Sequence, residues 1–273
     1  MTEEAPLISI LMGVLNCAGT LDESLECLTS QTEQRWEAVI CDDGSTDGTY
    51  DVLKRWQEHY PEKIVLLRNN ENRGLSVTLN RCLKAARGQY AARMDGDDLC
   101  APDRLEKELR FLRDHPDYAI VSTDMLCFDE AGTWGCRAYP TDPQPGDLVH
   151  GTPFCHAGCM VRMDALRAAG GYSENEAYER VEDYELWVRM YAMGFRGGNI
   201  HEGLYRMRDD RNAAARRKWK YRVNEARVRA EAVRKLGLPV HNYVCVLRPL
   251  ILGLLPRPVS AFLHHIKLRK GIG

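Results

Sequence analysis

The chain has 273 residues, 44% of them hydrophobic and 28% charged, which suits one large folded domain with an appendage and excludes a disordered chain. The formal net charge of -2 hides an asymmetry, because 20 basic and 35 acidic residues precede Arg206 while 17 basic and 4 acidic residues lie from Arg206 onward. Ten cysteines in a chain that starts without signal-peptide features predict reduced thiols in the cytoplasm rather than a disulfide framework.

Four apolar runs in the first half of the chain predict buried strands, at residues 7–14, 36–41, 64–67 and 89–94. Helical periodicity lies between and after these runs. The alternation is typical of an α/β fold with a mostly parallel central sheet flanked by helices. From Ser122 to Thr152 the pattern loosens into Gly, Pro and aromatic residues, which predicts hairpins and a loop that partly covers the site.

Start and stop signals bound the predicted helices. Thr20-Leu21-Asp22-Glu23 has the form of a capping box and is expected to open the first helix. Pro61 ends the helix after the second strand, because proline cannot continue a helix. Pro102 suits the first turn of the helix after the fourth strand, where its missing N–H costs no helical hydrogen bond.

Two acidic segments follow predicted strands. Asp42-Asp43-Gly44-Ser45 comes after the second strand, and Asp95-Gly96-Asp97-Asp98 comes after the fourth. Open α/β sheets bind ligands at the carboxyl ends of their strands. Three carboxylates within four residues repel one another, which a bound divalent cation would relieve, and hard oxygen ligands favour magnesium or manganese. An ordinary Asp-Gly turn and a solvated acidic loop are the alternatives.

A third acidic segment, Val181-Glu182-Asp183-Tyr184-Glu185, opens a predicted helix. Acidic residues in a first turn interact favourably with the helix dipole, which alone accounts for them. If the fold brings this segment opposite the acidic cluster, a carboxylate here can take a proton from an attacking hydroxyl.

Taken in order, these segments resemble the family 2 glycosyltransferases, which are inverting enzymes with the GT-A fold. The resemblance spans Leu7 to about Tyr205 and leaves residues 206–273 as a basic helical tail. The motifs that carry it are Ile8-Ser9-Ile10-Leu11-Met12, Asp42-Asp43-Gly44-Ser45-Thr46-Asp47-Gly48-Thr49, Asn72-Arg73-Gly74, Asp95-Gly96-Asp97-Asp98 with Pro102-Asp103-Arg104, Gly170-Gly171-Tyr172, and Glu182-Asp183.

The resemblance implies a nucleotide-diphosphate sugar as donor, with UDP as the expected nucleotide, and a hydroxyl group as acceptor. Asp43, with Asp42 beside it, would contact the base, and Arg73 would lie near the nucleotide. Asp95 matches the ribose side of the family's Asp-x-Asp motif. The products expected are cell-surface polysaccharides or glycolipids.

The same resemblance assigns the chemistry. Asp97 would be the direct ligand of Mn²⁺ or Mg²⁺, and Asp183 would be the catalytic base of a single in-line displacement that inverts the anomeric carbon. The Gln-x-x-Arg-Trp motif of processive synthases is absent after Asp183, which favours transfer of one sugar per encounter.

Five further residues are weaker candidates. Arg206 and Arg208 would grip the diphosphate as a lid, or else stand solvated at the start of a basic helix. His156 would line the acceptor side, or else be a buried structural histidine. Glu182 and Asp98 are neighbours of the assigned carboxylates.

The sequence of the basic tail predicts helices that bind a membrane surface or pack on protein. Good helix formers follow Asn212, and the apolar runs 243–247 and 250–255 are too short to cross a bilayer. Residues 259–266 have the pattern of an interfacial amphipathic helix. The tail would hold the chain at the anionic inner face of the cell membrane, near a lipid-linked acceptor, or would pack on the domain or another subunit. Nucleic acid is not expected, because the tail has no recognised binding motif.

Two other functions share some of these features. A sugar nucleotidyltransferase should carry a basic, Gly-rich loop after its first strand, whereas Gly13 to Gly19 contains no Lys or Arg. A catalytically inactive module that binds nucleotide sugars should not need its full set of carboxylates, yet Asp43, Asp97 and Asp183 are all present.

Overall fold

One nine-stranded sheet organises the computed structural model, which describes residues 6–209 and 218–255. The strand order is β3-β2-β1-β4-β8-β6-β9-β5, and β7 pairs with β6. The strands are β1 (Ile8–Val14), β2 (Trp36–Asp42), β3 (Ile64–Arg68), β4 (Tyr90–Arg93), β5 (Leu99–Cys100), β6 (Tyr118–Asp129), β7 (Gly132–Arg137), β8 (Cys159–Arg162) and β9 (Arg196–Arg208).

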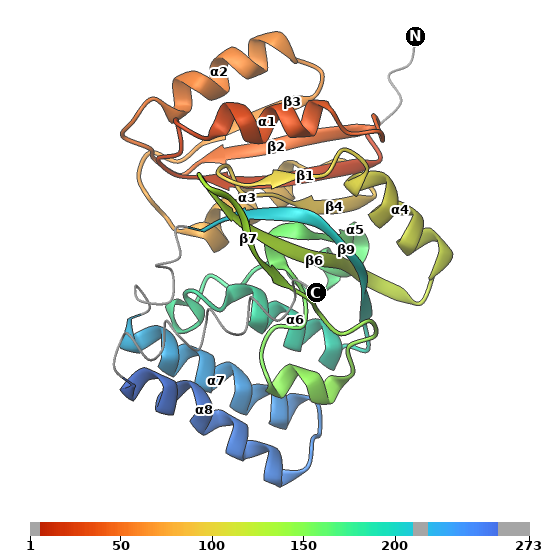
Figure 1. Cartoon of the computed structure of the whole chain (residues 1–273), viewed down its shortest axis with the longest axis vertical. Helices are drawn as coiled ribbons and strands as arrows, with labels where there is room; N and C mark the ends of the chain where they lie inside the picture. Colours follow the sequence, from red (N-terminus) through yellow and green to blue (C-terminus); the bar gives the residue numbers. More distant parts are fainter. Residues whose placement is uncertain (1–5, 210–217, 256–273) are drawn as a thin grey trace.

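Helices cover both faces of this sheet (Figure 1). Ile8, Ile10 and Met12 of β1 pack with one set of helices, while Leu11 packs on the opposite face with another, as the alternation of a strand requires. The helices are α1 (Leu21–Thr29), α2 (Thr49–His59), α3 (Leu75–Ala85), α4 (Arg104–Asp114), α5 (Met163–Ala168), α6 (Glu182–Ala192), α7 (Trp219–Lys235) and α8 (Val244–Leu254).

The four strands predicted in the first half are confirmed as β1 to β4, and these four run parallel. In the register of β1 and β2, Val14 lies beside Asp42, so the two strands end together. β4, on the other side of β1, ends at Arg93, directly before the acidic segment. The carboxyl ends of β1, β2 and β4 therefore bring both acidic segments to one edge of the sheet.

The cap of one helix and the start of another differ from the prediction. The capping box is wrong, because α1 begins at Leu21 without a side-chain cap, and the Thr20 hydroxyl donates instead to the Gly96 carbonyl at 3.1 Å. A tertiary acceptor has taken the hydroxyl that would have capped the helix. Pro102 lies before α4 rather than in its first turn, since that helix begins at Arg104.

The loosely patterned middle of the chain contains the predicted hairpin, formed by β6 and β7. The first strand of this hairpin, β6, is long and also pairs with β8 and β9. Its parallel partner β9 contains three glycines, which hide a strand in the sequence. A Cβ on Gly198 would lie 2.7 Å from Phe111, and one on Gly203 would lie 2.7 Å from Leu126. These glycines therefore allow close packing over β9.

The basic tail does not separate from the body at Tyr205. β9 continues to Arg208, and α7 then places Val228, Ala232 and Val233 in the same apolar cluster as the core residues of α6. The C-terminal appendage is helical, as predicted, and α7 is part of the packed body. The helix expected from Asn212 begins within the described residues only at Trp219, and the amphipathic segment 259–266 lies outside them.

Candidate active site

A hollow of about 470 Å³ lies between the end of β1 and the acidic segment. Its lining includes Asp95, Gly96, Asp97 and Arg208, together with residues 13–17 and the following turn. Gly96 permits a close approach here, because a Cβ at this position would lie 2.8 Å from Val14 and 2.9 Å from Cys17. The acidic segment thus lies directly against the end of β1.

Asp95 is held by a residue that the sequence analysis missed. Arg93, which is 2% exposed, forms an ion pair with the Asp95 carboxylate and donates to the Met94 carbonyl. The Tyr205 hydroxyl lies 3.2 Å from the Asp95 backbone nitrogen, which donates to it. The signal was available, since an arginine at the end of a fully buried strand needs an anionic partner nearby.

Asp97 and Asp98 point to different surroundings. Asp97 is exposed and lines the hollow, where the removal of water by surrounding protein and then repulsion from Asp95 raise its pKa. Asp98 is buried and accepts hydrogen bonds of 2.7 Å from the Tyr205 hydroxyl and the Arg208 backbone. Burial, with repulsion from the two neighbouring aspartates, raises the pKa of Asp98 to about 8. Asp98 therefore fastens the end of β9.

The three carboxylates of the acidic segment do not converge as a set. Within residues 6–209 and 218–255, no group of three or more His, Cys, Asp and Glu side chains is arranged to hold a metal ion. Asp95 and Asp97 remain at the hollow. Magnesium and manganese suit such a site, because Mg²⁺ is commonly bound through one or two carboxylates and completed by substrate phosphates. The donor chemistry of this pair fits that arrangement.

Asp42 and Asp43 shape the backbone beside the hollow. Asp43 accepts from Asn69 Nδ2 at 2.6 Å and from the backbone nitrogens of Arg73 and Gly74 at 2.9 Å. Asp42 accepts from the Ser45 backbone and lies 3.1 Å from Arg68 in an ion pair.

The segment Asp42-Asp43 is linked to the lining of the hollow by a backbone hydrogen bond. The Asp43 amide donates to the carbonyl of Val14, which lines the hollow, while the Arg73 side chain is exposed. The carboxylate of Asp43 thus fixes the turn that carries Arg73 into α3. None of Asp42, Asp43 and Arg73 is among the residues that line the hollow itself.

Asp183 and Glu182 occupy the first turn of α6. Burial, then repulsion from Asp183, raises the pKa of Glu182 to about 7. Burial also raises the pKa of Tyr172, and this tyrosine feels both Arg93, which opposes the rise, and Asp183, which adds to it. Tyr172 therefore lies within electrostatic range of the arginine that holds Asp95 and of the start of α6.

His156 belongs to the same neighbourhood. Its Nε2 lies 2.9 Å from the Tyr172 hydroxyl, and its ring meets those of Tyr172 and Trp187 edge-on. Burial, and then the positive charge of Arg93, lower the pKa of His156 well below the usual range. The imidazole is therefore neutral near pH 7, in an aromatic cluster that includes Trp187 of α6.

Arg206 and Arg208 do not begin a basic helix, because both lie in β9. The Arg206 guanidinium stacks over the Phe128 ring at 4.9 Å. Arg208 lines the hollow, where its Nε donates to the Asp97 carbonyl at 2.9 Å and its Nη2 pairs with Glu23 at 2.6 Å. Pairing within the sheet fixes the backbone of both residues.

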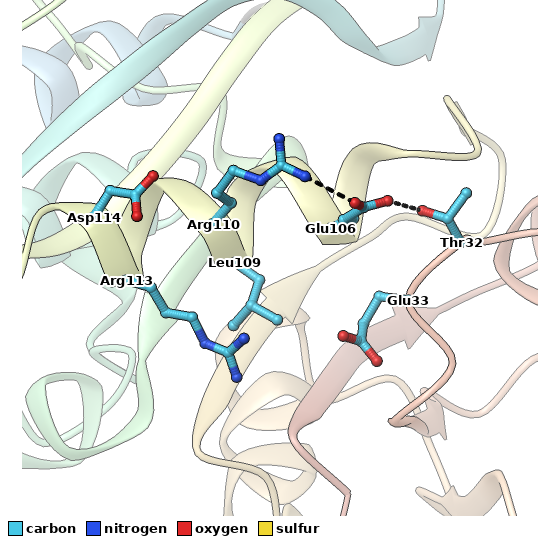
Figure 2. Close-up of a pocket in the computed structure, with 7 residues that line it drawn as sticks. All are labelled: Thr32, Glu33, Glu106, Leu109, Arg110, Arg113 and Asp114. Atoms are coloured by element: carbon cyan, nitrogen blue, oxygen red, sulfur yellow. Dashed lines mark hydrogen bonds and ion pairs between the residues drawn. The ribbon is translucent and has the colours of Figure 1, made fainter.

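A second hollow, of about 430 Å³, lies on the outer side of α4 (Figure 2). Arg110 and Glu106 form an ion pair of 3.0 Å there, and the Thr32 hydroxyl donates to Glu106 at 2.7 Å. None of the predicted site residues lines it. The hollow at the strand ends is therefore the better candidate for a functional site.

Comparison with known proteins assigns this arrangement to a family. A profile of the family described as "Glycosyl transferase family 2" matches residues 9–169. EpsE of Bacillus subtilis (strain 168), whose description as a glycosyltransferase is itself provisional, is 44% identical over 259 residues, covering 95% of this chain and 93% of its own. The Escherichia coli protein WfaP, named as a UDP-Glc:alpha-D-GlcNAc-diphosphoundecaprenol beta-1,3-glucosyltransferase, is 26% identical and covers 91% of this chain and 94% of its own.

A solved structure has the same fold. The mannosyltransferase PcManGT from Pyrobaculum calidifontis, in complex with GDP-Man and Mn²⁺, superposes with a TM-score of 0.62 at 21% sequence identity. The match covers 97% of this chain and 74% of that one.

Proposed function

The chain is a member of glycosyltransferase family 2, and we propose that it transfers one sugar from a nucleotide-diphosphate sugar to a hydroxyl acceptor with inversion. One observation carries the proposal: Asp97 is exposed in a hollow at the strand ends, beside an Asp95 carboxylate that a buried Arg93 holds in place. A carboxylate pair fixed in this way suits a ligand that brings phosphate groups and a divalent cation.

The donor nucleotide would lie along the ends of β1 and β2. We assign the base to the turn shaped by Asp42 and Asp43, with Arg73 at its rim, because the Asp43 carboxylate accepts hydrogen bonds from two backbone nitrogens of that turn and one from the Asn69 side chain. A UDP-sugar is our choice of donor, since the name of WfaP specifies UDP-Glc. The GDP-Man bound to PcManGT marks the other choice.

Mn²⁺ or Mg²⁺ is the proposed cofactor, held by Asp97 with Asp95 on the ribose side. When bound, such a cation neutralises the charge that builds on the departing diphosphate. Arg93 keeps the Asp95 carboxylate oriented toward the hollow, and Arg208 fixes the Asp97 backbone through its carbonyl. PcManGT, which shares the fold, contains Mn²⁺.

Asp183 is the proposed base. The acceptor oxygen forms its bond to the anomeric carbon as the bond from that carbon to the diphosphate oxygen breaks, and the acceptor proton passes to the Asp183 carboxylate. Attack and departure on opposite sides invert the anomeric centre in one step. The position of Asp183 in the first turn of α6 is compatible with the role, because a carboxylate there interacts favourably with the helix dipole.

We place the acceptor in the synthesis of cell-surface polysaccharide or glycolipid, on a lipid carrier at the inner face of the membrane. WfaP supports a lipid-linked acceptor, since its name specifies a diphosphoundecaprenol substrate. No helix in the described parts of the chain has the length and hydropathy needed to cross a bilayer. The excess of basic over acidic residues from Arg206 onward supports contact with an anionic surface instead.

A screen of nucleotide sugars tests the donor assignment. Thermal unfolding is measured with UDP- and GDP-sugars, with and without manganese, because a ligand that binds the folded state raises the melting temperature. We expect a UDP-sugar to stabilise the chain only when manganese is present, and Asp97→Asn to abolish that shift. Equal stabilisation of both proteins without metal would overturn the metal assignment.

Product analysis separates the alternatives. Donor hydrolysis with manganese should yield a nucleoside diphosphate in the native chain, whereas Asp183→Asn should be slow. Failure of both proteins to turn over any donor that they bind would instead indicate an inactive binding module. Release of pyrophosphate from a nucleoside triphosphate and a sugar phosphate would indicate a nucleotidyltransferase.

A further inference from the structure

The outer face of α8 carries an apolar stripe that the described structure leaves uncovered. Val240 in the short turn η5 (Val240–Tyr243) begins it, and the stripe continues every three or four residues along one side of the helix. The side chains concerned are Val240 (80% exposed), Val244 (70%), Leu247 (54%), Ile251 (57%) and Leu254 (76%). Exposed apolar residues that gather on one face mark an interaction surface, unlike those scattered singly.

Helix α8 packs on α7, which is itself hydrogen-bonded to the body of the protein. α7 and α8 lie side by side at the opposite end of the molecule from α2 (Figure 1). The buried Arg229 of α7 donates to the carbonyls of Val149 at 2.6 Å and His150 at 3.0 Å, which ties α7 to the body. The same guanidinium reaches the Cys245 carbonyl at 3.5 Å, a group that would otherwise lack its helical donor because Pro249 has no N–H.

The charged residues in the segment that carries the stripe are all basic. From Ala232 to Gly273 the sequence contains seven Lys and Arg residues and no Asp or Glu. One of these basic residues, Arg248, is exposed on α8 between Leu247 and Ile251. An apolar stripe on a segment whose charged residues are all basic is complementary to an anionic lipid surface, where apolar side chains enter the acyl boundary and basic groups meet the headgroups.

We propose that Val244, Leu247, Ile251 and Leu254 form a docking face that inserts into the headgroup region of an anionic bilayer, with Arg248 at the lipid headgroups. The proposal rests on the membrane contact proposed above and identifies the surface that makes it. A second copy of the chain fits this face less well. Stripe against stripe would bring two Arg248 residues together, and their own segments offer no acidic residue to neutralise them.

Vesicle flotation with the full-length chain tests the docking face. The vesicles contain phosphatidylcholine with phosphatidylglycerol, or phosphatidylcholine alone. We expect the native chain to float with the anionic vesicles and Leu247→Glu to lower the partition coefficient about tenfold or more, since a large apolar side chain is lost from the bilayer. Leu254→Glu, at the end of the helix, is a second variant that disturbs the α7–α8 contact less.

Tyr60→Glu is the matched control, because it exchanges an exposed apolar residue for the same charge just after α2. It should float like the native chain. Circular dichroism checks that each variant is folded, and light scattering measures its mass. The proposal would be overturned if both α8 variants floated as well as the native chain. It would also be overturned if the native chain bound the neutral vesicles but not the anionic ones. A native dimer that Leu247→Glu converts to a monomer would assign the face to a second copy.

Flotation involves no sugar transfer, so the two proposals fail separately. A native chain that transfers sugar to a soluble acceptor but never floats would retain the proposed function and lose the docking face. A chain that floats through α8 but never turns over a donor would retain the docking face and lose the proposed function.

Discussion

Charged side chains are usually exposed and large apolar side chains are usually buried. The acidic segment breaks the first rule and α8 breaks the second. Around the acidic segment the protein buries charge, since Arg93 and Asp98 are almost inaccessible and each is paired with a specific partner. On α8 it exposes large apolar side chains that have no cover among the described residues. The buried charges are offset by partners inside the chain, whereas the exposed apolar side chains indicate a surface outside it.

The comparison also separates two kinds of sensitivity. A buried charge depends on one partner, so loss of that partner is severe. An exposed apolar residue depends on no neighbour in the chain, so its substitution leaves the fold nearly unchanged and affects only what binds there. The following predictions test this difference, from the largest expected effect to the smallest.

The largest effect is expected at the proposed base. Asp183→Asn should lower kcat about 10²- to 10⁴-fold, the usual contribution of a positioned proton acceptor. Steady-state transfer assays measure this loss. Glu182→Gln is the control in the same helical turn and should leave most of the activity. The reverse ranking of the two variants would move the base to Glu182.

Loss of a buried ion-pair partner should come next. Arg104 and Glu108 on α4 are both fully buried and lie 3.1 Å apart. Glu108→Gln leaves the Arg104 charge uncompensated and should lower the free energy of unfolding by about 3–5 kcal/mol. Urea denaturation measures the change.

The same helix provides a matched control for that experiment. Arg110 and Glu106 have the same spacing along α4, but both are exposed (Figure 2). Glu106→Gln should lower the free energy of unfolding by no more than about 1 kcal/mol. Equal losses in the two variants would contradict the view that burial sets the sensitivity.

A pH-dependent effect of intermediate size is expected at Glu182. Its pKa in the folded chain is about 7, above the ordinary 4.5, so the folded state binds more protons than the unfolded state between these values. Stability should therefore fall as pH rises from 4.5 to 7. Glu182→Gln removes this loss, and above pH 7 it should be more stable than the native chain by at most about 3 kcal/mol. Thermal unfolding across this range measures the difference, which should vanish at pH 4.

The smallest effect on stability should come from α8. Val244→Ser and Leu254→Ser, at exposed positions, should change the free energy of unfolding by no more than about 0.5 kcal/mol each. Denaturant titration of the free protein measures this. A loss above 2 kcal/mol would mean that another part of the chain covers the stripe and that α8 belongs to the core.

The sequence was most informative where one local pattern determined one outcome. The apolar runs that form β1 to β4 are long enough to be unambiguous, and an acidic segment at the end of a parallel strand lies at the sheet edge in any α/β fold. β9 was missed because Gly197, Gly198 and Gly203 remove the side chains by which a strand is recognised. These glycines are explained only by neighbours distant in sequence, such as Phe111.

Within the site, residue identity was easier to predict than side-chain direction. Asp97 and Asp98 are adjacent and chemically identical, yet one lines the hollow and the other binds Tyr205 in the interior. The difference depends on the Tyr205 hydroxyl and the Arg208 backbone, which are 107 and 110 residues away from Asp98. Arg93, in contrast, could have been found, because an arginine within the strand predicted at residues 89–94 would be buried and would need an anionic partner nearby.

The register of β4 has a consequence for protein engineering. Arg93, Asp95 and Asp97 lie at every second position, and β4, which ends at Arg93, is paired on both sides, with β1 and with β8. A one-residue insertion or deletion in this strand would shift its pairing with both neighbours and turn Arg93, with the acidic segment that follows it, out of place at the sheet edge. Chimeric enzymes should therefore inherit residues 90–98 as one unit. The exposed turn at Glu130 and Ala131, between β6 and β7, is the better place for a junction or an inserted tag.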